Sequence, residues 1–248
     1  MSSRERLDTS LVGRGLAESR ERAKGLILAG LVRVDGERVT QAGFRVREAQ
    51  RIEVDGPEHP FVSRGGVKLA GALDGFGFSV RGKVCFDVGA STGGFTDCLL
   101  QRGASLVHAV DVGYGQLAWK LREDPRVLVQ ERTNVRTLPP AILEPVPSLA
   151  VIDASFISLR LLLEPTLAQL GGARDIVALV KPQFEVGRDR VGKGGVVSDP
   201  AARQEAVDNV ALFARGIGLA VHGVRDSSLP GAKKGNIEVF LHLRAERG

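Results

Sequence analysis

The chain has 248 residues, a formal net charge of +5 and 43% hydrophobic residues. This length suits one domain of ordinary size plus a small one, and this apolar content excludes a disordered chain. The small excess of basic residues is compatible with a polyanionic partner such as nucleic acid but does not require one.

Signals for export, membrane insertion and metal binding are not found in the sequence. The start, MSSRERLDTS, lacks the apolar segment of a signal peptide, and no apolar run approaches the ~18 residues of a membrane span. We therefore expect a cytoplasmic protein with no membrane partner. Cys85 and Cys98 stand in apolar stretches, which predicts buried, reduced thiols. The four histidines lack metal-ligand spacing, so we predict no metal site.

The first sixty residues predict a small α+β unit. Ser19 is a suitable N-cap for a helix, Gly30 is a suitable end for it, and Asp35-Gly36 favours a two-residue hairpin turn. Asp55-Gly-Pro57 and Pro60 indicate the end of the unit. The expected elements are helices at Arg6–Val12 and Ser19–Gly30 and strands at 31–34, 37–40 and Arg51–Val54.

From residue 63 onward, segments with strand character alternate with segments of helical character. Such alternation predicts a parallel sheet with helices on both faces. We therefore expect a first domain at 1–59, a linker at 60–62 and an α/β domain at 63–248. The expected strands are Val84–Asp87, Leu106–Val110, Val127–Gln130, Leu149–Ile152, Ile176–Val180, Leu219–Val224 and Ile237–Leu243, and the expected helices are Val67–Leu73, Gly94–Gln101, Gln116–Arg122, Leu159–Leu170 and Pro200–Gly216.

A glycine-rich turn, DVGASTGGF, follows the first strand of this second domain and opens a helix. Glycines let the backbone approach a ligand closely, and Asp111, at the end of the next strand, can bind the hydroxyls of a nucleoside ribose. A plain strand–helix turn and a nicotinamide dinucleotide site are the alternatives. Asp87 can meet the amine of a methionine moiety, and the glycine spacing differs from G-x-G-x-x-G, so S-adenosyl-L-methionine is favoured. The expected cofactor-binding residues are Asp87, Gly89, Ala90, Ser91, Thr92, Gly93, Gly94, Phe95, Asp111, Val112 and Asn134.

Several segments resemble one family over almost the whole chain. VSRGGVKL, DVGASTGGFT, VDVGYGQLAWKLR, ERTNVR, DASFISL, LVKPQFEVG and GNIEVF are similar to the haemolysin A (TlyA) family of ribosomal RNA ribose 2′-O-methyltransferases, and more distantly to FtsJ-type RNA methyltransferases. The first sixty residues resemble the alpha-L RNA-binding module of pseudouridine synthases and of the small-subunit ribosomal protein S-four. The resemblance implies a Rossmann-like class I methyltransferase domain behind a small α+β RNA-binding domain.

The resemblance also implies a catalytic quartet, which at the matching positions is Lys68, Asp153, Lys181 and Glu238. Lys181 would accept the proton of the ribose hydroxyl or stabilise the developing oxyanion, and Asp153 would hold it. Lys68 would lower the pKa of Lys181 by like charge and contact the substrate, and Glu238 would orient either Lys68 or the ribose. The implied substrate is a cytidine of 23S rRNA, with 16S rRNA as a second target in some members. The expected partner is thus rRNA in ribosomal subunits, 50S before 30S, bound by a monomer.

Basic residues suggest where RNA would bind. Arg4, Arg6, Arg20 and Lys24 cluster around the first two predicted helices, while Arg64 and Arg132 stand beside the catalytic and cofactor motifs. An ordinary charged surface is the alternative for the first group. The basic, glycine-rich segment 186–199 predicts either a flap over the RNA or a solvated loop. We expect the target nucleotide to be flipped out of its stack. A non-catalytic ribosome assembly factor and a membrane-active haemolysin are the alternative functions.

Overall fold

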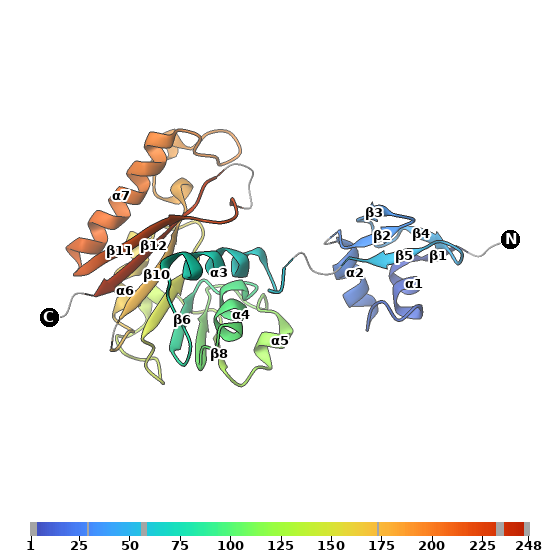
Figure 1. Ribbon diagram of the computed structural model, residues 1–248, viewed down its shortest axis with the longest axis horizontal. Helices are drawn as coiled ribbons and strands as arrows, with labels where there is room; N and C mark the ends of the chain where they lie inside the picture. The colour runs from blue at the N-terminus through green and yellow to red at the C-terminus, as the bar shows by residue number, and fades with distance from the viewer. Residues whose placement is uncertain (1–3, 29, 56–58, 173, 232–235, 246–248) are drawn as a thin grey trace. The chain divides into compact units, whose positions relative to one another are not determined.

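The computed structural model describes residues 4–28, 30–55, 59–172, 174–231 and 236–245. The chain divides into two compact units, Met1–Pro60 and Phe61–Gly248. Among these residues the first unit has one hydrophobic cluster, and the second has two, one on each face of its sheet. Figure 1 shows the helices and strands of both units.

In the first unit, two helices pack beside two small antiparallel sheets. One sheet has the strand order β3-β2-β5, and the other pairs β1 with β4. Leu7, Leu11 and Ile27 from the helices are fully buried against Val32 and other residues of the sheets. The elements are β1 (Arg4–Arg6), α1 (Leu7–Gly13), α2 (Arg20–Leu28), β2 (Val32–Val34), β3 (Glu37–Val39), β4 (Arg45–Arg47) and β5 (Ile52–Val54).

The turns of this unit follow the sequence closely. Ser19 Oγ accepts a hydrogen bond of 3.1 Å from Arg22 N at the start of α2. Gly30 has a φ of 70° and donates to Ile27 O, which confirms it as the terminating glycine. Asp35 and Gly36 both have positive φ, as the predicted hairpin turn requires. β1 and β4 were not predicted, because each has only three residues and its partner lies about forty residues away in the chain.

The second unit contains a seven-stranded sheet in the order β11-β12-β10-β9-β6-β7-β8. The described elements of its first half are α3 (Arg64–Phe76), β6 (Val84–Val88), α4 (Gly94–Gln101), β7 (Leu106–Val110), α5 (Trp119–Arg122), β8 (Val127–Gln130), a 3-10 turn at Val135–Thr137 and β9 (Leu149–Ile152). Those of the second half are α6 (Arg160–Leu167), β10 (Asp175–Val180), 3-10 turns at Pro182–Phe184 and Arg188–Arg190, α7 (Pro200–Gly216), β11 (Leu219–Asp226) and β12 (Val239–Ala245).

The expected α/β architecture is confirmed, but the sheet is not parallel throughout. β12 runs antiparallel to both of its neighbours, β10 and β11. The chain passes from β11 to the adjacent β12 with no helix among the described residues of that connection, and such a direct return produces an antiparallel pair. The sheet is thus mostly parallel, as predicted from the sequence, with β12 as the antiparallel exception.

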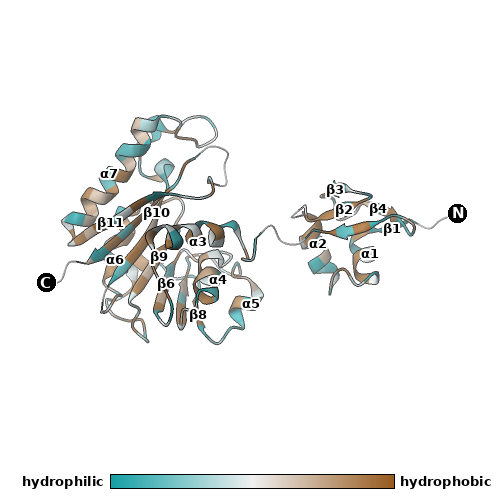
Figure 2. Cartoon of the chain, viewed as in Figure 1, coloured by the Kyte–Doolittle hydropathy of each residue, from teal (hydrophilic) through white to brown (hydrophobic). Residues whose placement is uncertain are grey.

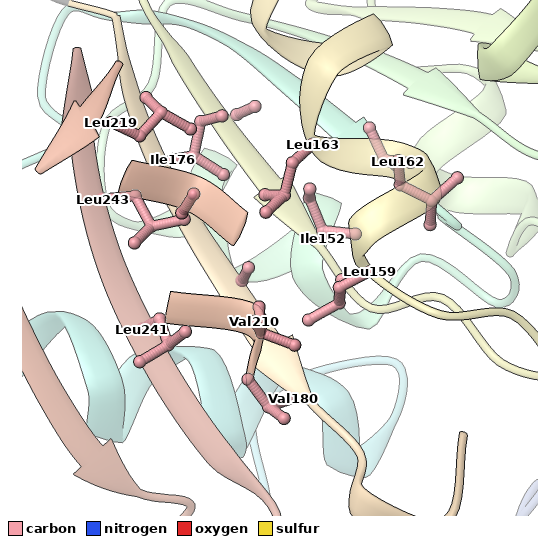
Figure 3. Packing of buried hydrophobic residues seen from close by; sticks show 14 of the residues in the cluster. Ile152, Leu159, Leu162, Leu163, Ile176, Val180, Val210, Leu219, Leu241 and Leu243 are labelled. Carbon is pink, nitrogen blue, oxygen red and sulfur yellow. The ribbon is translucent and has the colours of Figure 1, made fainter. Parts of the chain in front are cut away.

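Helices cover both faces of the sheet. Ile152, Ile176 and Leu241 point toward α6 and α7, where they pack with Leu163 and Val210 (Figure 3). The alternate residues of the same strands point toward α3 and α4, because successive side chains of a strand face opposite ways. Figure 2 shows hydrophobic residues along these central strands, between the two helical layers.

In this unit, α5 differs from the sequence-based prediction, whereas the two cysteines agree with theirs. α5 has only four residues instead of the predicted seven, because Ala118 has an extended ψ of 138° that prevents an earlier start. Cys85 and Cys98 are buried free thiols, as predicted, and burial raises the pKa of each to about 12.

Candidate active site

The candidate site lies at one edge of the seven-stranded sheet. The carboxyl ends of β6, β9 and β10 reach this edge, as does the amino end of the antiparallel β12. β6 has β7 as its neighbour on one side, reached through α4, and β9 as its neighbour on the other side. The strand order therefore reverses at β6. Open α/β sheets bind their ligands at such a point, beyond the carboxyl ends of the strands.

Strand alternation places four charged residues on one face of this edge. Their neighbours Val88, Ile152, Val180 and Val239 all belong to the core beneath α6 and α7. Because side chains alternate along a strand, the residue beside each of these points to the opposite face, toward α3 and α4. The four residues so placed are Asp87, Asp153, Lys181 and Glu238.

α3 brings the fifth charged residue to this face. Lys68 Nζ donates a hydrogen bond of 2.5 Å to Glu238 Oε2, although the two residues lie 170 positions apart. Lys68 is 8% exposed and Glu238 is 3% exposed. A charge buried to this degree needs a partner, and here each residue is the partner of the other.

Lys181 forms the second ion pair of the site. Its Nζ lies 2.5 Å from Asp153 Oδ1 and donates a hydrogen bond of 2.9 Å to Ser155 Oγ. β10 and β12 pair through Val180 and Val239, and Lys181 keeps an extended backbone, so the next pair in register is Lys181 opposite Glu238. Residues directly opposite in an antiparallel pair have Cβ atoms about 5 Å apart. The two ion pairs are therefore neighbours.

The glycine turn between β6 and α4 lies directly against the Asp153 segment. Gly89 has a φ of 85°, and a Cβ atom there would stand 2.8 Å from Asp153 O. Gly93 has a φ of 95°, and a Cβ atom there would stand 2.2 Å from the side chain of Leu121. Only glycine satisfies both the backbone conformation and the close approach at these positions. Of the other turn residues, Ser91 and Thr92 are exposed, whereas Ala90 and Gly94 are buried.

Asp87 is fully buried beneath this turn. Its Oδ2 accepts a hydrogen bond of 2.6 Å from Thr96 Oγ1, whereas no donor among the described residues reaches its Oδ1. Burial is the main cause that raises the pKa of Asp87 to about 7, with smaller contributions from the charges of Asp153 and Asp111 and an opposing effect of its hydrogen bonding with Thr96. A buried carboxylate oxygen without a donor suits a cationic ligand group such as an ammonium.

Asp111 stabilises the turn from the neighbouring strand end. Its two carboxylate oxygens accept hydrogen bonds from Ser91 N at 2.8 Å and from Gly113 N at 2.6 Å. Each oxygen keeps a lone pair that could accept from a ribose hydroxyl. Val112 is 70% exposed beside it. Thr133, the residue before Asn134, donates its backbone N–H to Asp111 O. Asn134 Oδ1 accepts a hydrogen bond from Arg136 N.

Phe95 differs from the other predicted cofactor residues. It is 3% exposed, its ring stacks on Phe240 at 6.1 Å, and it belongs to the core beneath α3 and α4. Its side chain is therefore part of the core, so a ligand in the turn could meet only its backbone.

The predicted RNA-binding residues fall into different surroundings. Arg6 and Arg20 both bind the carboxylate of the fully buried Asp8, whose pKa they lower, Arg6 most strongly. Arg4 and Lys24 are exposed in the same unit. The sequence does not indicate the burial of Asp8, because that burial depends on packing between α1 and α2.

The two predicted RNA-binding residues of the second unit are exposed near its site. Arg64 donates to Pro230 O at 3.1 Å, and the Arg132 guanidinium stacks over the Tyr114 ring at 4.2 Å. Segment 186–199 is not simply a solvated loop. Val197 is buried there, and its N–H donates to Asn236 Oδ1 at 2.9 Å.

Three polar residues of the site were not singled out from the sequence. Ser155 binds Lys181, Thr96 binds Asp87, and Glu185 binds Ser158 and the backbone of Leu159. Ser155 and Glu185 stand within the segments DASFISL and LVKPQFEVG, so their place in those segments was an available signal. Nothing in the sequence connects Thr96 with Asp87, because their contact depends on the path of α4.

Comparison with known proteins agrees with this geometry. The model of the FtsJ-like methyltransferase family matches residues 61–245, and that of the S4 domain matches residues 5–52. The chain belongs to the FtsJ-like methyltransferase family. It is 50% identical over 247 residues to the 16S/23S rRNA (cytidine-2′-O)-methyltransferase TlyA of Mycobacterium tuberculosis, covering 99% of this chain and 92% of that protein.

Two further proteins that are similar to this FtsJ-like methyltransferase are named as hemolysins. Hemolysin A of Brachyspira hyodysenteriae is 41% identical over 239 residues, covering 96% of this chain and 99% of that protein. A solved structure named "Putative hemolysin from Streptococcus thermophilus" is 42% identical, has a TM-score of 0.77 and covers 100% of this chain and 90% of that chain. Among the described residues, no helix is long and apolar enough to span a membrane.

Proposed function

We propose that this protein transfers a methyl group from S-adenosyl-L-methionine to the ribose 2′-hydroxyl of a cytidine in rRNA. The observation that carries the proposal is the pair of adjoining ion pairs, Lys68–Glu238 and Lys181–Asp153, beside a glycine turn with a buried carboxylate beneath it. The relative from Mycobacterium tuberculosis is named for this reaction on 16S and 23S rRNA.

The glycine turn and the two aspartates fit the methyl donor. The Asp87 carboxylate has an oxygen free for the ammonium of the methionine moiety, and Asp111 can accept from the ribose hydroxyls. Val112 offers an exposed apolar contact for the adenine, near Asn134. The donor, when bound, supplies a methyl group on a positively charged sulfur, which is intrinsically reactive. The chain therefore has to orient the acceptor hydroxyl and stabilise its oxygen.

Lys181 is the residue we assign to that oxygen. Its ammonium is paired with Asp153 Oδ1 at 2.5 Å and donates a hydrogen bond to Ser155 Oγ at 2.9 Å, and its remaining N–H groups can donate to the acceptor. A fixed cation lowers the energy of an oxygen that gains negative charge as its proton leaves. Lys68, fixed by Glu238, would contact the ribose beside Lys181.

An exposed aromatic ring supports the flipped nucleotide. Phe156 is 88% exposed, follows Ser155 directly and lies 5.3 Å from the Phe184 ring. Its φ of 65° is strained for an aromatic residue, and such strain concentrates at functional sites. We infer that Phe156 stacks against the base of a nucleotide turned out of its helix.

The N-terminal unit would hold the rest of the RNA. We propose that residues 1–59 form an RNA-binding domain, joined by residues 60–62 to the catalytic domain at 63–248. Arg4 and Lys24 offer exposed charges for phosphates, and Arg6 and Arg20 keep further N–H donors beyond their bonds to Asp8. The proposed partner is rRNA within ribosomal subunits, 50S before 30S, bound by a monomer in the cytoplasm.

The proposal is tested with labelled S-adenosyl-L-methionine and separate, unmodified 30S and 50S subunits, followed by mapping of the 2′-O-methyl group. We expect label on a cytidine of the 50S subunit. Lys181→Ala should abolish it, whereas Lys83→Ala, which changes a lysine just before β6 at the opposite edge of the sheet, should not. Label on neither subunit would leave a non-catalytic assembly factor as the better explanation, and leakage from lipid vesicles would support a haemolysin.

A further inference from the structure

Two loops carry the proposed catalytic lysine and aspartate, and they contact each other at three points. The loop after β9 runs from Asp153 to Leu159, where α6 begins, and the turn after β10 runs from Lys181 to Glu185. At the first point Lys181 contacts both Asp153 and Ser155, and at the second the Phe184 and Phe156 rings meet. The third contact is made by Glu185 at the far end of both loops.

The Glu185 carboxylate makes two short hydrogen bonds across this junction. Its Oε2 accepts from Ser158 Oγ at 2.6 Å, and its Oε1 accepts from Leu159 N at 2.7 Å. Its side chain is only 2% exposed, and Arg160 Nε lies 3.8 Å from its Oε2. Both oxygens are therefore engaged with the end of the Asp153 loop.

Glu185 satisfies a backbone N–H at the start of α6. The residue before the helix is Leu159, whose apolar side chain cannot accept from the free N–H groups of the first turn. Glu185, 26 residues further along the chain, accepts from the backbone N–H of Leu159 itself. Burial raises the pKa of its carboxyl against the bonds from Ser158 and Leu159, so the position is unfavourable for a charge. Ser158 Oγ already accepts from Arg160 N at 3.3 Å in the first turn of α6, so capping of the helix alone does not require this buried carboxylate.

We propose that Glu185 is a positioning residue that holds the Asp153 loop against the Lys181 turn. The inference rests on the function proposed above. Asp153, Ser155 and Phe156 all lie in the span between β9 and the Glu185 anchor. Without that anchor the loop is held only near its beginning, and the strained backbone of Phe156 is free to relax. The Lys181 ammonium then loses its fixed direction toward the acceptor hydroxyl.

The test compares Glu185→Ala and Glu185→Gln with Glu164→Ala, which removes an exposed carboxylate of the same helix. We expect Glu185→Ala to lower kcat on 50S subunits by about tenfold or more, since misplacing a reacting group by ~1 Å can cost about a hundredfold. KM for the subunits and Kd for S-adenosylhomocysteine should stay within about threefold of wild type. Glu185→Gln should restore most of kcat, because its amide can accept from Leu159 N and bond to Ser158. Glu164→Ala should behave as wild type.

Three outcomes would overturn the inference while leaving the proposed function intact. They are a wild-type kcat in folded Glu185→Ala, a Gln variant as slow as the Ala variant, or a rise in KM alone. If Glu185→Ala does not fold, Ser158→Ala decides, because it removes one of the two bonds to Glu185 and keeps the other, from Leu159 N. Its kcat should fall by about threefold or more, and an unchanged kcat would reject the role. An inactive wild-type enzyme would instead reject the proposed function itself.

Discussion

Asp87 gives the sharpest prediction, because its protonation should control donor binding. Its carboxyl is fully buried, and its pKa is raised from 3.8 to about 7. That change corresponds to about 4 kcal/mol against the ionised form in the ligand-free protein. Only the ionised form attracts the ammonium of the donor. We therefore expect the donor's Kd to rise about tenfold for each pH unit below about 7, and to be nearly constant above it.

Calorimetric titration with S-adenosylhomocysteine, which keeps the methionine ammonium, measures this between about pH 5.5 and pH 8.5. Asp87→Asn should bind weakly at every pH, with no slope, because its amide carries no charge. Asp208→Asn on the exposed face of α7 is the matched control and should follow the wild-type curve. A flat wild-type curve across pH 7, or wild-type affinity in Asp87→Asn, would refute the role of this carboxylate.

The Asp87 carboxyl should also affect the free energy of unfolding of the ligand-free protein. Because its folded pKa lies above the unfolded value, the folded chain holds the proton more tightly between pH 3.8 and about 7. Its contribution to the free energy of unfolding therefore decreases as the pH rises through that window. At pH 8, ligand-free Asp87→Asn should be more stable than wild type, by at most about 4 kcal/mol, in denaturant titrations.

Three other substitutions test separate parts of the structure. Lys181→Ala should keep the wild-type Kd for S-adenosylhomocysteine, measured by calorimetry, and lose methyl transfer. Wild-type turnover in this variant would contradict the role of Lys181. Asp8→Ala should lower the stability of α1 by about 1–2 kcal/mol above pH 4, seen as faster hydrogen exchange, and the loss should shrink at lower pH as the wild-type carboxyl protonates. Gly93→Ala should weaken S-adenosylhomocysteine binding by about tenfold or more through its clash with Leu121, whereas Gly77→Ala, also at positive φ but in open space, should not.

Much of the fold was predictable because it depends on local chemistry. Ser19, Gly30 and Asp35-Gly36 act within a few residues of their own position, and the structure places each where the sequence predicts it. The strand–glycine turn–helix succession around residues 84–101 is local in the same sense. Elements without such local signals were missed or misplaced, as with the three-residue strands β1 and β4, which exist only as each other's partner.

The sequence by itself therefore determined the class of the protein: alternating strands and helices, a glycine turn for a nucleoside and a set of chemically able residues. Only the tertiary structure decided how those residues work together. The reversal of β12 brings Glu238 to the same sheet edge as Lys181, and α3 brings Lys68 to Glu238 across 170 residues of chain. The buried carboxyl of Asp87 and the anchor of Glu185 likewise depend on burial and on partners distant in sequence. Charge and hydrogen-bond energies depend on these surroundings, and residue order alone does not specify them.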